Sequence, residues 1–206
     1  MKGLAISACL LFMGSCAALG HQKVDHLATA QIASDFNSYT LHRVGLLPIV
    51  GRELGPEHAK LLQGALYTEL SLQTPFEIVP LSERDLEHML PMDGFIRGRY
   101  DPAMVIELAR RFRFDAMLIG TVVDYSFYSP LRLSLQMDMV ATETGASIWS
   151  SSVQLDANSM RVKNAVEAYH RSSAGIEAED GNGWELSLLS PKLFAQFGAW
   201  QIASML

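Results

Sequence analysis

The segment ELARRFRFDAMLIGTVVDY, residues 107–125, decides the fold class of this 206-residue chain. Its first part continues a helix predicted to begin at Asp101-Pro102, because aspartate caps a helix and proline suits its first turn. The apolar stripe of that helix consists of Val105, Leu108, Ala109 and Phe112. Residues 116–123 are apolar without alternation, which is typical of a central strand covered on both faces. A helix that leads into a buried strand indicates an α/β fold.

Shorter elements precede this pair. Residues 43–50 (RVGLLPIV) and 76–80 (FEIVP) are predicted strands. Between them, Gly55-Pro56 opens a helix with apolar residues at three- and four-residue spacing. These residues are Ala59, Leu62, Leu66 and Leu70. A short helix from residue 83 to about 90 follows, with Ser82 as N-cap and Asp85 completing a variant capping box.

The part that follows predicts a β-meander. Apolar and polar residues alternate strictly over residues 131–139, so one face of that strand is dry and the other wet. Glu143-Thr144-Gly145 is a predicted hairpin turn, and residues 147–155 return as the partner strand. The order of elements predicts one α/β (α+β) domain over residues 42–156, a mixed β-sheet with helices packed on it.

Residues 157–206 are expected to be a helical extension. It contains a helix at about 158–173, an acidic glycine-rich loop at 175–183 and a last helix opened by Ser190-Pro191. The last helix is too short to cross a bilayer core of roughly 30 Å. Packing on the domain is its simplest explanation. The alternative is docking on a neighbouring subunit or partner, for which Phe194, Phe197 and Trp200 are the candidate interface residues.

The first fifteen residues have the layout of a signal peptide: Lys2, then an apolar run, then small residues. Met13-Gly14-Ser15-Cys16 resembles a lipobox, so Cys16 is the predicted lipidation site. Residues 16–41 would form the lipid-anchored tether, and Ala17 after the cysteine points by sorting rules to an outer membrane, facing the periplasm. The alternative is an ordinary secreted protein with an incidental cysteine. A second local match ending at Cys9 has too short an apolar stretch.

Composition and motifs exclude several functions. A net charge of −6 without a cluster of lysine and arginine argues against a nucleic-acid partner. The six histidines form no metal-binding pattern, and the Asp85–His88 pair fits a solvated helix face. The turn at residues 51–56 lacks the lysine of a phosphate loop, and no serine-hydrolase motif is present. We therefore expect no enzyme, no cofactor and no metal site.

Three arginines stand close together at the end of the helix before the central strand: Arg110, Arg111 and Arg113. Cations suit a helix C-terminus because they oppose the helix dipole, and this structural explanation is sufficient. Arginine is also enriched at protein interfaces. This edge is therefore the second candidate interface.

The segments VGLLPIVG, FEIVPLSERDLEHML, ELARRFRFDAMLIGTVVDY and GASIWSSSVQL, in this order, resemble the CsgG/TolB N-terminal-like superfamily. The resemblance covers residues 43–156 and identifies a fold better than a function. It implies kinship with the curli secretion channel subunit, the Pel polysaccharide export lipoprotein and the lipoprotein activator of a penicillin-binding protein. Residues 122–155 leave room for three ordinary strands and two turns, so a relative without membrane hairpins is expected.

These observations lead to one main hypothesis: a non-catalytic envelope lipoprotein that supports an export, secretion or cell-wall machine through protein contacts. Its partners would be the lipid bilayer, through acylated Cys16, and an envelope protein or further copies of itself. The alternative is a ring-forming subunit of an outer-membrane secretion or polysaccharide-export complex. An enzyme acting on an envelope polymer would need convergent acids or a nucleophile, which the sequence does not offer.

Overall fold

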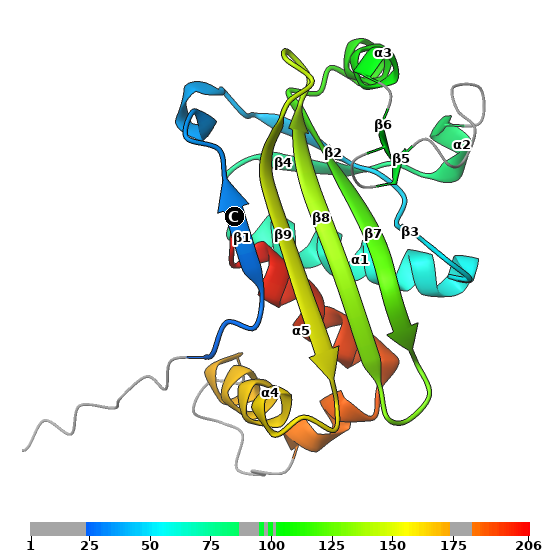
Figure 1. Cartoon of the computed structure of the whole chain (residues 1–206), viewed down its shortest axis with the longest axis vertical. Helices are drawn as coiled ribbons and strands as arrows, with labels where there is room; N and C mark the ends of the chain where they lie inside the picture. The colour runs from blue at the N-terminus through cyan, green and yellow to red at the C-terminus, as the bar shows by residue number, and fades with distance from the viewer. Residues whose placement is uncertain (1–23, 87–94, 97–98, 101, 174–182) are drawn as a thin grey trace, which may run out of the picture.

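A computed structural model describes residues 24–86, 95–96, 99–100, 102–173 and 183–206 (Figure 1). Its elements along the chain are β1 (Thr29–Ile32), η1 (Phe36–Ser38), β2 (Arg43–Leu46), β3 (Val50–Gly51), α1 (Pro56–Gln73), β4 (Glu77–Pro80), α2 (Glu83–Leu86), β5 (Phe95–Ile96), β6 (Arg99–Tyr100), α3 (Pro102–Phe112), β7 (Ala116–Ser126), β8 (Arg132–Ala141), β9 (Ser147–Asp156), α4 (Met160–Ser173), η4 (Gly183–Leu188) and α5 (Pro191–Ala203). The predicted acidic loop at 175–183 lies outside the described residues except for Gly183. His88 also lies outside them.

The main sheet is mixed. Its strands lie in the order β1-β9-β8-β7-β2-β4, and the short β3 also pairs with β7. The pairs β1–β9, β9–β8 and β8–β7 are antiparallel, whereas β2–β7, β2–β4 and β3–β7 are parallel. β5 and β6 pair separately with each other. This arrangement confirms the predicted mixed sheet with helices packed on it.

The larger core lies between the sheet and the helices α1 and α5, which Figure 1 draws behind the strands. The dry face predicted for β8 is confirmed, because Leu133, Leu135, Met137 and Met139 all point into this core. The opposite face is not wet along its whole length, because Asp138 on it is buried. From the helices, the core takes Leu62, Leu66, Leu70, Phe194 and Phe197. Burial of these large side chains is the main stabilising contribution to the fold.

A smaller core on the opposite face packs α3 against one end of the sheet. Its residues include Leu47, Val105, Leu108, Phe114, Met117, Ile119 and Val140. Along β7, Met117 and Ile119 therefore face this core while Leu118 faces the larger one. Coverage on both faces explains why residues 116–123 are apolar without alternation.

One close approach in this region requires a glycine. A Cβ on Gly45 would lie 2.6 Å from the Phe114 ring. Phe114 enters the smaller core directly after the end of α3, so β2 must pass beneath it without a side chain. The predicted turn at Gly145 is also confirmed, with a φ of 70° that glycine adopts without strain.

The structure differs from the predicted boundaries at both ends of the chain. Residues 29–32, expected within a tether, form the edge strand β1 and pair with residues 149–152 of β9. Residues of α4 and α5 belong to the same core as the sheet, so they are part of the domain and not an extension from it. The predicted strand at 43–50 is also divided, because Pro48 separates β2 from β3. None of the described helices is both long enough and apolar enough to cross a membrane.

Candidate functional site

The arginine edge lies where α3 ends. Arg110, Arg111 and Arg113 are all exposed, and α3 lies at the end of the sheet opposite α4 (Figure 1). Arg113 has a φ of 57°, and after it the Phe114 amide donates to the Ala109 carbonyl at 3.2 Å. This left-handed residue ends the helix and turns the chain back toward the core. The three exposed arginines therefore stand at the turn where the chain leaves α3.

The Arg111 side chain lies between α3 and the start of α2. Its guanidinium carbon is 5.2 Å from the centre of the Phe112 ring. The pKa of Asp85 in α2 lies below its ordinary value, chiefly because the Ser82 hydroxyl donates to this carboxylate at 2.6 Å. The Ser82 amide donates as well, at 2.8 Å, and the positive charge of Arg111 adds a smaller effect in the same direction. One half of the capping box predicted from the sequence is thus present, the bond from the Ser82 amide to the Asp85 carboxylate. The other half differs, because the Asp85 amide donates to the Ser82 carbonyl and not to its hydroxyl.

Asp115 holds the arginine edge against β2. Its carboxylate accepts hydrogen bonds from the amides of His42 at 2.8 Å and Arg43 at 2.9 Å. The Arg43 side chain in turn donates to the Phe112 carbonyl at 2.7 Å and pairs with Glu77 at 3.2 Å. Asp115, together with Arg43, therefore joins β2 to the end of α3 and the start of β7.

The last helix packs on its own domain. Phe194 and Phe197 are fully buried in the larger core, so these two candidate interface residues are core residues of this chain. Trp200 is only half-buried, stacks on the His26 ring with centroids 5.6 Å apart, and lies against Tyr169. A helix that is apolar almost all round needs to be buried, and here the sheet and α1 of the same chain provide the surface that buries it. Of the predicted aromatic interface, only Trp200 retains accessible surface.

Gln201, which the sequence analysis did not single out, ties α5 to the start of the domain. Its side chain is fully buried; Oε1 accepts from the Leu27 amide at 2.7 Å and from the Ala28 amide at 3.4 Å. Its Nε2 donates to the Asp25 carbonyl at 3.0 Å. The sequence feature that could have identified Gln201 is its position among the apolar residues of the last helix, because a buried side-chain amide needs hydrogen-bond partners.

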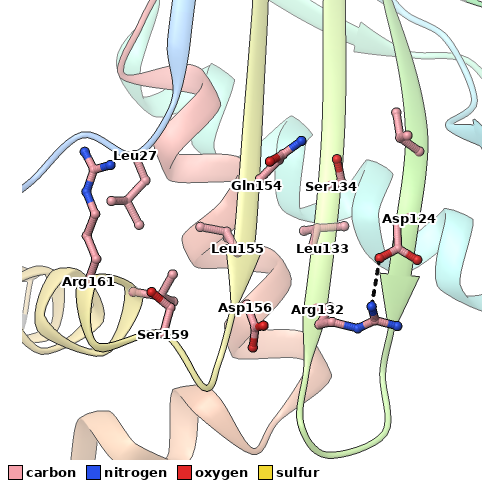
Figure 2. A pocket seen from close by; sticks show the side chains of 12 residues that line it. Leu27, Asp124, Arg132, Leu133, Ser134, Gln154, Leu155, Asp156, Ser159 and Arg161 are labelled. Atoms are coloured by element: carbon pink, nitrogen blue, oxygen red, sulfur yellow. Dashed lines mark ion pairs between the residues drawn. The ribbon is translucent and has the colours of Figure 1, made fainter.

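A shallow hollow of about 510 Å³ lies beside this N-terminal segment (Figure 2). It is formed by β7, β8, β9 and the start of α4, with Leu27 and Arg161 on its far side. Asp124 pairs with Arg132 at 3.3 Å, and Asp156 accepts from the Asn158 amide at 2.8 Å. These carboxylates serve an ion pair and a turn, and the hollow is open to solvent. We assign it no chemistry.

The remaining sequence candidates are structural where the chain is described. Residues 51–56 form the turn predicted for them; Glu53 has a φ of 61° and its carbonyl accepts from the Tyr125 hydroxyl at 2.8 Å. Within the described ranges, no three histidine, cysteine or acidic side chains gather as a metal site would require. Cys16, the predicted lipidation site, lies outside the described residues.

Comparisons with known proteins give structural neighbours alone. No protein-family model and no curated protein matches the chain. Among solved structures, the PelC dodecamer from Paraburkholderia phytofirmans is 11% identical, with 67% of this chain and 87% of that chain covered and a TM-score of 0.46. Lipoprotein GNA1162 from Neisseria meningitidis is 17% identical, with 57% and 85% covered and a TM-score of 0.41. The C-terminal domain of LpoB from Escherichia coli is 18% identical, with 59% and 98% covered and a TM-score of 0.39. These neighbours are of the kind that the sequence resemblance named, but at identities of 18% or less and TM-scores below 0.5 the likeness establishes neither the family nor the function of this chain.

Proposed function

We propose that this chain is a non-catalytic lipoprotein of the bacterial cell envelope, anchored in the outer membrane through acylated Cys16 and facing the periplasm. It supports the assembly of an export, secretion or cell-wall machine by contacting an envelope protein or further copies of itself. The observation that carries this proposal is the lipobox-like Met13-Gly14-Ser15-Cys16, whose cysteine lies eight residues before Val24, the first residue that the structure describes.

The geometry of the domain supports lipid attachment at one end and protein contact at the other. The chain enters beside α4, whereas the arginine edge of α3 lies at the other end of the long strands (Figure 1). β8 has 10 residues, so the two ends are separated by about 34 Å. An anchor at one end thus leaves Arg110 and Arg113 at the end of the domain remote from the lipid attachment, where a protein partner can reach them. Two weak attachments, one to lipid and one to protein, together localise such a domain.

Acylation is tested by growing cells with labelled palmitate and comparing two cysteine variants. Wild type and Cys9→Ser are expected to carry the label and to fractionate with membranes, and Cys16→Ser is expected to lose both properties. Cys9→Ser is the matched control, because it removes the other cysteine of the same leader. Label on Cys16→Ser, or its absence from wild type, would reject the anchor.

The arginine edge is tested by placing a photo-crosslinking residue at position 110 in the anchored protein, with position 67 on α1 as an exposed control. A discrete adduct identified by mass spectrometry as an envelope protein or a second copy is expected only at position 110. It should be lost in Arg113→Glu and retained in Lys60→Glu, a charge reversal at another exposed site. Equal crosslinking from both positions would show that the edge is not the interface.

Light scattering of the purified protein distinguishes an adaptor from the ring-forming alternative. A single-chain mass fits an adaptor or activator. A defined larger species that Arg110→Glu dissociates would assign the edge to contacts between copies.

A further inference from the structure

The end of the domain opposite α3 exposes large apolar side chains from three separate elements. Tyr128, in the turn between β7 and β8, is 83% exposed, and Met160, the first residue of α4, is 67% exposed. Leu186 in η4 and Leu189 just after it are 61% and 63% exposed. Single exposed apolar residues are ordinary, but several gathered at one end of a domain indicate a contact surface.

These elements lie next to one another. Ser129 and Pro130, which follow Tyr128, line one shallow hollow together with Asn158, Trp184 and Leu189. In Figure 1 the β7–β8 turn, α4 and the orange segment before α5 all lie at the lower end of the molecule. The exposed side chains therefore belong to one end, which we call the apolar end: Tyr128, Met160, Leu186 and Leu189.

The chain enters the domain at the same end. Leu27 lies with Ser159 and Val162 around the hollow of Figure 2. The bonds from Gln201 fix the backbone of residues 25–28 there. Cys16 is eight residues before Val24, so the chain between them spans at most about 28 Å. A lipid chain on Cys16 would therefore keep the domain near the bilayer, attached at the end of the domain that carries the apolar end.

The charges around the apolar end also suit a lipid surface. Arg161 follows Met160 on α4, and Lys163 lines the same hollow as Leu189. Long cationic side chains beside exposed apolar residues can bury their stems while their charges meet lipid phosphates. Glu185 lines that hollow as well. The attraction to lipid phosphates would therefore come from the individual side chains of Arg161 and Lys163, and not from a net positive charge of this surface.

We propose that the apolar end, with Arg161 and Lys163, rests on the surface of the lipid leaflet that holds the acyl chain of Cys16. This inference depends on the proposed anchor and adds to it an orientation. The acyl chain alone keeps the domain near the membrane; contact through the apolar end directs α3 and its arginines away from the bilayer.

Trp184 provides a probe for this contact, because it belongs to η4 and lines the hollow with Leu189. The full-length acylated protein is reconstituted in vesicles of phosphatidylethanolamine and phosphatidylglycerol, with and without bromine on the acyl chains. Brominated lipid is expected to quench tryptophan fluorescence in the wild type. The quenched component should disappear in Trp184→Phe and fall in the double variant Leu186→Ser/Leu189→Ser.

Leu72→Ser is the matched control, since Leu72 on α1 is 76% exposed and does not belong to the apolar end. Its quenching should equal that of wild type. Acylated protein that stays on the vesicles but shows no quenching of Trp184, or equal quenching in the double leucine variant, would overturn the contact and leave the anchor intact. Vesicle binding by Cys16→Ser equal to that of wild type would instead overturn the anchor. Circular dichroism of each variant verifies that the fold is retained.

Discussion

Gln201 is expected to decide whether the first residues of the domain stay attached to it. In Gln201→Ala, the Leu27 amide loses an acceptor at 2.7 Å and the Asp25 carbonyl loses a donor at 3.0 Å. The third bond, to Ala28, is long at 3.4 Å and contributes little. Leaving a buried polar group without a partner costs about 1–3 kcal/mol, and water reaches the exposed Asp25. We expect a loss of about 2 kcal/mol in the free energy of unfolding.

Urea denaturation and a thermal melt measure this loss. For a chain of this length, about 2 kcal/mol corresponds to a decrease of roughly 4–8 °C in Tm. Gln201→Met keeps most of the side-chain volume, so it separates the hydrogen bonds from the packing. Gln196→Ala, which loses one bond of 3.2 Å to Glu69, is the control and should cost less than about 1 kcal/mol. A Gln201→Met protein as stable as wild type, with unchanged hydrogen exchange at residues 27–32, would refute the reasoning.

Three further predictions concern the sheet and the arginine edge. Gly45→Ala should lower the free energy of unfolding by about 1–3 kcal/mol in urea denaturation, because its Cβ would lie 2.6 Å from the buried Phe114 ring. Gly120→Ala should cost less, because its Cβ would meet the Cδ1 of Ile49, the end of a flexible side chain, at 2.5 Å. Equal losses in the two variants would contradict this explanation. Arg113→Gly should raise the free energy of unfolding by up to about 1 kcal/mol, since Arg113 holds a φ of 57° that glycine adopts freely, and a lower Tm would argue against that origin. Ser82→Ala should raise the pKa of Asp85 toward its ordinary value in an NMR titration, because the hydroxyl bond is the largest cause of the lowering. A depressed pKa in the folded state stabilises α2 above the unfolded pKa, and this contribution is lost as the pH falls through the folded pKa.

The predictable parts of the fold are those governed by local periodicity. Strict alternation defined β8, and the unbroken apolar run of residues 116–123 reflected burial of Met117 on one face and Leu118 on the other. The strand β1 was missed because its sequence TAQI is short and partly polar, and its partner is the distant β9. No local pattern reveals a pairing of that range.

The sequence predicted which residues are candidates for the interface, but not how the fold places them. The exposed arginines at the end of α3 followed from the helix pattern. The left-handed conformation of Arg113 did not, because it is imposed by the return of Phe114 to the core. The burial of Phe194 and Phe197 depended on whether α5 docks in cis, which an apolar helix leaves open. The sheet and α1 provide the surface that decides it.

The first described residues contact the last helix, α5, and this has a consequence for the order in which the domain is built. The first described residues are bonded by Gln201, and the Trp149 indole donates to the Met205 carbonyl at 3.0 Å. Residues 25–28 are synthesised long before their partner Gln201 in α5, which lies 176 positions after Asp25. Until α5 arrives, β1 has only its pairing with β9, and the apolar face of the sheet beneath α5 is uncovered. A chain truncated before residue 191 would therefore lack both the core helix α5 and the bonds that hold residues 25–28, so the domain can close only after α5 has been synthesised.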